Sequence, residues 1–210
     1  MRTIYGKDVL DRLPELLDPS HTVLVVVGMS GKAYGDHPGG ESGGSTPAIE
    51  SMAGRLSVLV EAARQTGASV VWVEDASAGV EFTDSASWLY YKARRAALVR
   101  ASKEFHSTGG LLAPRSGEPL IGKTRLNAFV GTTLDRVLRN LGAKTVVVAG
   151  VATEATVEST ARSAIYQDYY SVIVADCVAS WDDGLHEASL TAMSSQCDVA
   201  TSQQVLAVWD

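Results

Sequence analysis

Short apolar runs separated by amphipathic segments constrain the fold of this chain most strongly. Residues 22–27 and 145–149 are nearly all apolar and rich in β-branched side chains. Runs of this length and composition are typical of strands that are buried on both faces of a parallel sheet. Between them, apolar residues recur at steps of three and four, as on the buried side of a helix. The pattern predicts an α/β fold, a three-layer α/β/α sandwich around a doubly wound, mainly parallel sheet.

The remaining elements follow the same alternation of strand and helix signals. Further strands are expected at 69–73, 171–175 and 199–201, and helices at 52–63, from Trp88 to about 102, at 126–141, 185–193 and 202–208. In 126–141 the apolar positions Leu126, Val130, Leu134, Val137, Leu138 and Leu141 lie three or four residues apart. No internal repeat and no linker divides the chain, so residues 1–210 are predicted to form a single domain.

Composition and charge exclude several classes of partner. The chain of 210 residues is 46% hydrophobic, which is enough to bury a core of its own. Its formal net charge of -6 and pI near 5.2 offer no basic surface for nucleic acid or an anionic membrane. No apolar run approaches the roughly 20 residues that a membrane helix needs, and the first residues do not resemble a signal peptide. We therefore expect a cytoplasmic protein with no nucleic-acid or membrane partner.

The two cysteines, Cys177 and Cys197, are too few for a disulfide framework and lack the spacing of a metal site. Both lie in apolar or helix-flanking surroundings. We expect two buried thiols.

The segment 122–162, GKTRLNAFVGTTLDRVLRNLGAKTVVVAGVATEATVESTAR, carries the most functional information. Together with TVLVVVGMS before it and VIVADCVASWDDGLHEASL after it, this segment resembles the isochorismatase-like, or cysteine hydrolase, superfamily. The motifs occur in the family's order and cover roughly residues 18–208. The resemblance implies the same α/β fold that the periodicity predicts, and enzymes that act on small molecules.

In the hydrolytic members of that family, the resemblance implies an aspartate as general base, a supporting lysine and a nucleophilic cysteine. A non-proline cis peptide before the nucleophile turn helps to shape an oxyanion hole. The family's aspartate falls at Gly28, its lysine at Lys123 and its cysteine at Thr156. Two of the three catalytic groups are therefore replaced.

These replacements change the chemistry. A thiol with a reference pKa near 8.5 supplies some thiolate at neutral pH, whereas a threonine hydroxyl supplies essentially none without a strong base beside it. Gly28 removes that base. Isochorismatases proper act without the cysteine but need the aspartate as an acid, so Gly28 also argues against their reaction.

Four residues remain as catalytic candidates. Lys123 is either an acid/base group or anion anchor, or a structural lysine. Glu74 and Asp75 are expected to end a strand at the same sheet edge. One hypothesis is that one of them replaces the lost carboxylate; the alternative is that both are solvated loop charges. Thr156 either offers its hydroxyl and backbone amide to a substrate oxygen, or caps a helix.

Other residues are predicted to line the substrate site. They are Gly28, the turn residues Val151 and Ala152, the loop histidines His37 and His106, and the aromatic residues Trp88 and Tyr91. For the aromatic cluster, helix packing or a subunit contact is the alternative. Residues 74–77, Glu-Asp-Ala-Ser, lack the Asp-x-His pattern with which nicotinamidase-like relatives hold a metal, so we predict no metal and no cofactor.

Three functional hypotheses follow. The first is an enzyme that has lost the Asp/Cys pair and catalyses an acid/base step on a small carbonyl or carboxylate metabolite: a proton transfer, elimination, cyclisation or water-mediated reaction. The second is a catalytically inactive family member that acts as a ligand-binding or partner subunit. The third is a residual C–N amidohydrolase. The resemblance also implies a homodimer or homotetramer.

Overall fold

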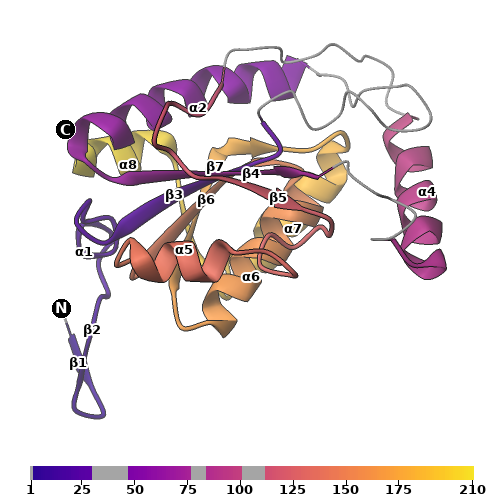
Figure 1. Ribbon diagram of the computed structural model, residues 1–210. Coiled ribbons are helices and arrows are strands. Elements are labelled where there is room, and N and C mark those ends of the chain that lie inside the picture. Colours follow the sequence, from indigo (N-terminus) through magenta and orange to yellow (C-terminus); the bar gives the residue numbers. More distant parts are fainter. Residues whose placement is uncertain (1, 30–46, 77–83, 101–111) are drawn as a thin grey trace.

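A parallel six-stranded sheet forms the centre of the molecule (Figure 1). The computed structural model describes residues 2–29, 47–76, 84–100 and 112–210. The strand order is β5-β4-β3-β6-β7-β8, and every neighbouring pair is parallel. The strands are β3 (Thr22–Val27), β4 (Ser69–Asp75), β5 (Leu120–Lys123), β6 (Thr145–Val151), β7 (Tyr170–Ala179) and β8 (Asp198–Ala200).

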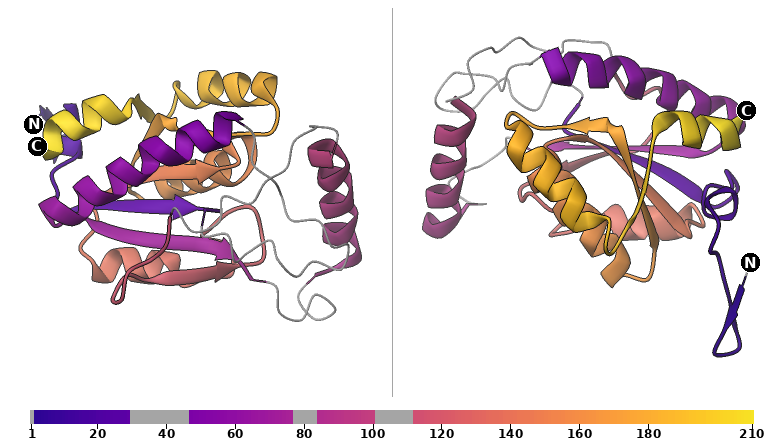
Figure 2. Two further views of the ribbon diagram at one scale, coloured as in Figure 1. Left: turned by 90° about the horizontal axis from the view of Figure 1, so that it is seen from above. Right: turned by 180° about the vertical axis from the view of Figure 1, so that it is seen from behind.

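Helices cover both faces of this sheet (Figure 2). One core cluster packs α1 (Leu13–Leu16), α2 (Pro47–Thr66) and α8 (Ser202–Trp209) against one face. The other cluster joins α5 (Leu134–Asn140), α6 (Glu158–Tyr166) and the end of α7 (Asp183–Met193) to the opposite face. The helix α4 (Ala86–Arg100) lies beyond the carboxyl ends of the strands. The predicted three-layer α/β/α architecture is confirmed.

The two central strands account for this arrangement. All six residues of β3 and all seven of β6 are buried, and their side chains alternate between the two core clusters. A strand that is apolar on both faces needs helices on both sides. The pairing of β3 with β4 and with β6 therefore brings the carboxyl ends of these strands to one edge of the sheet.

The predicted helix at 126–141 is wrong in its first half, because only Leu134–Asn140 is α-helical. In the segment that precedes this helix, polar side chains form hydrogen bonds with nearby backbone groups. Asn127 Oδ1 accepts from Phe129 N at 2.9 Å, and Thr132 Oγ1 donates to Ala128 O at 2.5 Å. Such local bonds compete with the helical ladder, and Gly131 adopts a positive φ of 69°. The helical spacing of Leu126 and Val130 therefore does not reflect a helix.

One strand is markedly longer than expected from the sequence, and three strands are additional. The strand expected at 171–175 extends from Tyr170 to Ala179, with a register shift opposite β6. Residues 120–123 form the edge strand β5, which is not among the strands expected from the sequence. A hairpin of β1 (Arg2–Ile4) and β2 (Lys7–Val9) was not expected.

We predict that Asp176 stabilises the fold by anchoring α8 to β7. Its carboxylate accepts from Ser202 N at 2.7 Å and from Ser202 Oγ at 2.6 Å. Because Asp176→Ala leaves these donors at the start of α8 without their acceptor, the free energy of unfolding should fall by about 1–3 kcal/mol. Urea denaturation measures this change. The matched variant Asp183→Ala, in the exposed first turn of α7, should change stability by less than about 0.5 kcal/mol. Equal losses in the two variants would contradict the anchoring role.

Candidate active site

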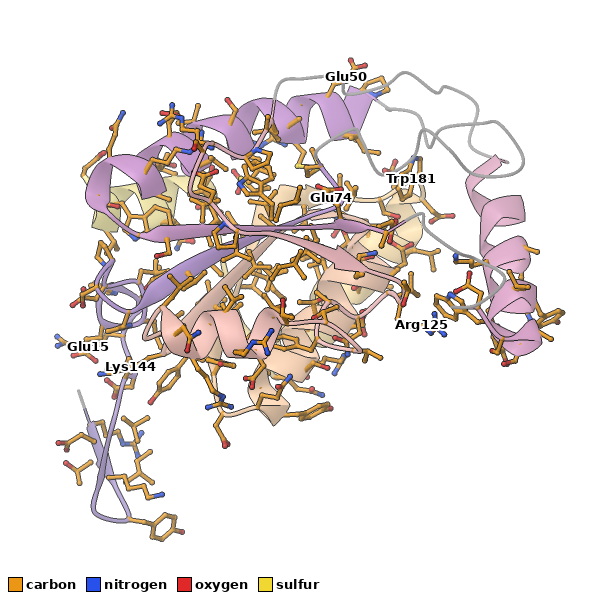
Figure 3. All side chains as sticks on the ribbon, viewed as in Figure 1. Glu15, Glu50, Glu74, Arg125, Lys144 and Trp181 are labelled. Carbon is orange, nitrogen blue, oxygen red and sulfur yellow. The ribbon has the colours of Figure 1, made fainter. Side chains whose placement is uncertain are left out.

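Four neighbouring strands deliver the predicted site residues to one edge of the sheet. Gly28 follows β3, Glu74 and Asp75 end β4, Lys123 ends β5, and Val151 ends β6. Parallel strands place their carboxyl ends together, and ligands of open α/β sheets bind at this edge. Figure 3 places Arg125 between the strand ends and α4.

An ion pair between Asp75 and Lys123 is the main charged contact of this edge. The two residues are direct partners in the parallel register of β4 and β5, and Lys123 Nζ donates to Asp75 Oδ1. The Lys123 side chain is only 3% exposed, whereas that of Asp75 is 31% exposed. Asp75 is therefore the more accessible member of the pair, and Lys123 is almost fully covered.

Glu74 faces the other way, toward the end of β3. Its side chain is buried, and Oε1 accepts from Met29 N at 3.1 Å. Gly28 N donates to Val73 O at 3.0 Å. Of the two carboxylates that follow Val73, Asp75 therefore pairs with Lys123, and Glu74 fixes the backbone beside Gly28.

Gly28 lies against the backbone of Val151. Its φ is +68°, and a Cβ built on it would be 2.8 Å from Val151 O. Real Cβ atoms do not approach a carbonyl oxygen so closely, and L side chains rarely adopt this φ. The positive φ and the close approach to Val151 O are therefore two separate reasons why glycine is favoured at this position.

The turn after β6 contains the expected cis peptide, between Val151 and Ala152. It leads into the π-helix η1 (Thr153–Val157), which holds Thr156, and then into α6. Thr156 is buried, and the N-cap position of α6 is Val157, so Thr156 does not serve as that cap. Thr153 Oγ1 lies 2.8 Å from His186 Nδ1, which ties η1 to α7. His186 thus makes a structural contact.

Two hydrogen bonds tie the segment after Lys123 to α6. Asn127 Nδ2 donates to Ser163 Oγ at 2.5 Å, and Ala128 N donates to Thr160 Oγ1 at 3.1 Å. The chain that carries Lys123 and the helix that follows Thr156 are thereby held together. Sequence reasoning did not find these contacts, because it assigned the segment to a helix.

A second charged cluster, which sequence reasoning missed, joins α4 to the segment after β5. The Asp84 side chain is 1% exposed and accepts from Lys92 Nζ at 2.6 Å and from Arg125 Nη1 at 3.1 Å. The Arg125 guanidinium lies over the Trp88 ring, 5.0 Å from its centroid. Trp88 is thus tied to the site edge through Arg125, which follows Lys123 by two residues. The sequence signal for this cluster was weak: an aspartate just before a predicted helix.

The remaining predicted site residues are Tyr91, His37 and His106, and the structure places only Tyr91. Tyr91 is exposed on α4 and packs edge-on against Tyr90, with 5.2 Å between the ring centroids. Helix packing, the alternative interpretation of this cluster, does not apply to these two tyrosines, because both are exposed. His37 and His106 lie outside the described residues, so their placement at the site stays a prediction.

Both cysteines are buried and free, as expected. Burial raises the pKa of the Cys177 thiol to about 12 and also raises the pKa of Cys197. Within the described ranges, no three His, Cys, Asp or Glu side chains gather as a metal site would require. None of the described helices is long and apolar enough to span a membrane.

A family model for the isochorismatase domain matches residues 22–204. The chain belongs to the isochorismatase family. It is 30% identical to the ureidoacrylate amidohydrolase RutB of Methylobacterium radiotolerans, over 97% of this chain and 87% of that protein.

Two solved structures share the fold of this chain. A cysteine hydrolase from Pseudomonas syringae pv. phaseolicola superposes with a TM-score of 0.76 at 22% identity, covering 96% of this chain and 97% of the other. The N-carbamoylsarcosine amidase of Thermoplasma acidophilum gives a TM-score of 0.61 at 25% identity, covering 87% and 96%. Two of these relatives, the ureidoacrylate amidohydrolase and the N-carbamoylsarcosine amidase, are named for their action on small molecules.

For this isochorismatase-family chain, we predict that an aspartate at position 28 is poorly tolerated. Gly28→Asp should lower the free energy of unfolding by about 2–4 kcal/mol, because the new Cβ meets Val151 O and the backbone has positive φ. Thermal and urea denaturation measure the loss.

Gly67→Asp is the matched control. Gly67 also has positive φ, at +83°, but no atom lies within 4 Å of the point that a Cβ would occupy there. This variant should cost only about 1 kcal/mol. If the two variants were equally stable, the contact between Gly28 and Val151 would not restrict this position.

Proposed function

We propose that this protein is an isochorismatase-family enzyme that catalyses an acid/base step on a small carbonyl or carboxylate metabolite, without a covalent thioester. The reaction is a proton transfer, elimination, cyclisation or water-mediated step. The observation that carries this proposal is the Asp75–Lys123 ion pair at the carboxyl edge of the sheet.

The unequal exposure of the pair suggests separate roles. Asp75 is the more exposed partner, so its carboxylate accepts a proton from the substrate or from a water molecule. Lys123 is almost fully covered, and its ammonium orients the carboxylate and balances its charge. Once Asp75 is protonated, its carboxyl group can return the proton to the product. Asp75 is thus the catalytic residue, and Lys123 positions it.

Nucleophilic catalysis has little support at this site. The family's nucleophile position aligns with Thr156, which supplies a hydroxyl rather than a thiol. The carboxylate position aligns with Gly28, where the close contact with Val151 leaves no room for a side chain. The two thiols of the chain are buried and have raised pKa values, so neither replaces the missing nucleophile.

Groups near the Asp75–Lys123 pair suit substrates with a carboxylate or a polarised carbonyl. The Asp84 carboxylate binds both the Arg125 guanidinium and the Lys92 ammonium beside the site. Trp88 adds an aromatic surface under the Arg125 guanidinium. Thr156, in the turn after the cis peptide, offers a hydroxyl and a backbone amide to a substrate oxygen.

The similarity to an ureidoacrylate amidohydrolase and to an N-carbamoylsarcosine amidase favours a second candidate, the hydrolysis of a C–N bond in a ureido or carbamoyl acid. In this chain, Asp75 would take a proton from water as the water oxygen attacks the carbonyl carbon. The proton would then pass to the leaving nitrogen as the C–N bond breaks. The pair of Asp75 and Lys123 serves both candidates, and the product distinguishes them.

We predict that Asp75→Asn abolishes turnover. The protein is incubated with a small-molecule extract and, separately, with ureido and carbamoyl acids, and compounds consumed or formed are identified by mass spectrometry. A compound that the wild type converts should remain unchanged with Asp75→Asn, because the amide cannot accept a proton. The variant leaves Lys123 covered without its carboxylate, so we also expect a stability loss of about 1–3 kcal/mol.

Asp135→Asn provides the control for loss of an ion pair. Asp135 pairs with Arg139 on α5, and its side chain is 38% exposed, close to the value for Asp75. This variant should retain turnover. Conversion that survives in Asp75→Asn would remove Asp75 from the mechanism. A compound that stabilises the wild type but is recovered chemically unchanged would support the inactive, ligand-binding alternative.

A further inference from the structure

The lysine of the candidate site belongs to a short strand at the edge of the sheet. β5 has four residues, and among the described strands it pairs with β4 alone. Leu120 and Gly122 are exposed, so Ile121 is the one apolar side chain of β5 that enters a core cluster. A strand with so few buried apolar side chains and a central glycine specifies its own register weakly.

The register of β5 decides whether the ion pair of the candidate site forms. Asp75 and Lys123 are partners in the observed register. A slip by one residue would turn every side chain of β5 to the opposite face of the sheet. Lys123 would then leave its covered position beside Asp75. The site therefore requires contacts that fix where β5 begins.

The carboxylate of Glu118, two residues before β5, joins three parts of the chain. Glu118 Oε1 accepts from Arg64 Nε at 2.6 Å, and Oε2 accepts from Arg64 Nη2 at 2.9 Å. Oε2 also accepts from Trp72 Nε1 at 2.7 Å and from Arg115 N at 2.8 Å. These donors come from α2, from β4 and from the segment that leads into β5. The side chains of Glu118 and Arg64 are only 14% and 15% exposed, so water screens their ion pair weakly.

Trp72 makes this cluster a reference point for the alignment of β5 with β4. Its side chain is fully buried in the core cluster that contains α2, so its position is fixed by packing. Its indole Nε1 donates to Glu118, and its backbone N donates to Pro119 O at 2.9 Å. One buried residue of β4 thus holds two consecutive residues just before β5. A slip of β5 along β4 would break both bonds.

We propose that Glu118 is a positioning residue, whose carboxylate sets the register of β5 on β4 and thereby places Lys123 against Asp75. Trp72 precedes Asp75 by three residues, which is about 10 Å along a strand, so Glu118 acts through β5 and does not touch the substrate. The inference rests on the proposed function for the role of the ion pair. The control of the register rests on the contacts of Glu118.

The test compares Glu118→Ala with the matched variant Asp176→Ala in the full chain, labelled with ¹⁵N at lysine side chains. Asp176 is also a carboxylate that accepts several hydrogen bonds, but it lies on β7, which β3 and β6 separate from β4 and β5. Nuclear magnetic resonance at low temperature observes the ammonium group of Lys123. Glu118→Ala should weaken or shift this signal, because Lys123 is no longer held against Asp75. Asp176→Ala should leave the signal at its wild-type position.

Backbone hydrogen exchange gives a second readout of the same contact. Ala76 N donates to Lys123 O at 2.7 Å, so the exchange of this amide reports the opening of β5 from β4. In Glu118→Ala the Ala76 amide should exchange about tenfold faster than in the wild type, because the opening no longer breaks the bonds of Glu118. Asp176→Ala should leave this rate unchanged, since the contacts of Asp176 remain intact when β5 opens.

Glu118→Gln keeps the side-chain volume and one acceptor oxygen, so it decides the question if Glu118→Ala does not fold. It should move the Lys123 signal and the Ala76 exchange rate in the same directions. An unchanged Lys123 signal in a folded Glu118 variant would overturn the proposal, as would equal acceleration of Ala76 exchange in Asp176→Ala. Neither readout needs a substrate. Turnover that survives in Asp75→Asn, which contradicts the proposed function, is therefore distinguishable from a failure of this inference.

Discussion

The parallel pairing of β4 with β5 determines the geometry of the candidate site, because it sets Asp75 directly opposite Lys123. This register is possible because β3 and β6, buried on both faces, hold the sheet in one orientation and bring four strand ends to the same edge. A carboxylate at the end of β4 then meets the lysine at the end of β5. The charged pair is thus a consequence of strand order, and it forms without a carboxylate on β3.

At Gly28, the position after β3, the backbone leaves no room for the carboxylate that the family carries there. Gly28 lies against Val151 O, so the backbone of this chain occupies the space that a side chain would need. Glu74 bonds to Met29 N just beyond, which supports the same backbone from the neighbouring strand. We interpret the site as one in which the carboxylate has moved from β3 to β4, while the lysine has remained in place. An acid/base reaction requires no more than this pair, whereas a thioester reaction requires a thiol that the site lacks.

The sequence was sufficient to predict the strand and helix layers, because the apolar runs of β3 and β6 allow few alternatives. Its motifs also predicted Gly28, Lys123 and Thr156 as site positions, and they left Glu74 and Asp75 as alternatives for the carboxylate. It could not choose between these two, since the choice depends on the register of β4 with β5. The helix expected at 126–141 failed for a local reason, because Asn127 and Thr132 bond to nearby backbone. The cluster around Asp84 depends on contacts between segments about 40 residues apart, which spacing alone does not reveal.

The most direct test of this account observes the ammonium group of Lys123 itself. In protein labelled with ¹⁵N at lysine side chains, nuclear magnetic resonance at low temperature should show a slowly exchanging ammonium signal from Lys123, since it is covered and ion-paired. The account predicts that Asp75→Asn removes or strongly shifts this signal, while Asp135→Asn leaves it unchanged. A Lys123 signal that exchanges rapidly in the wild type, or that is unaffected by Asp75→Asn, would contradict the claim that Asp75 is its functional partner.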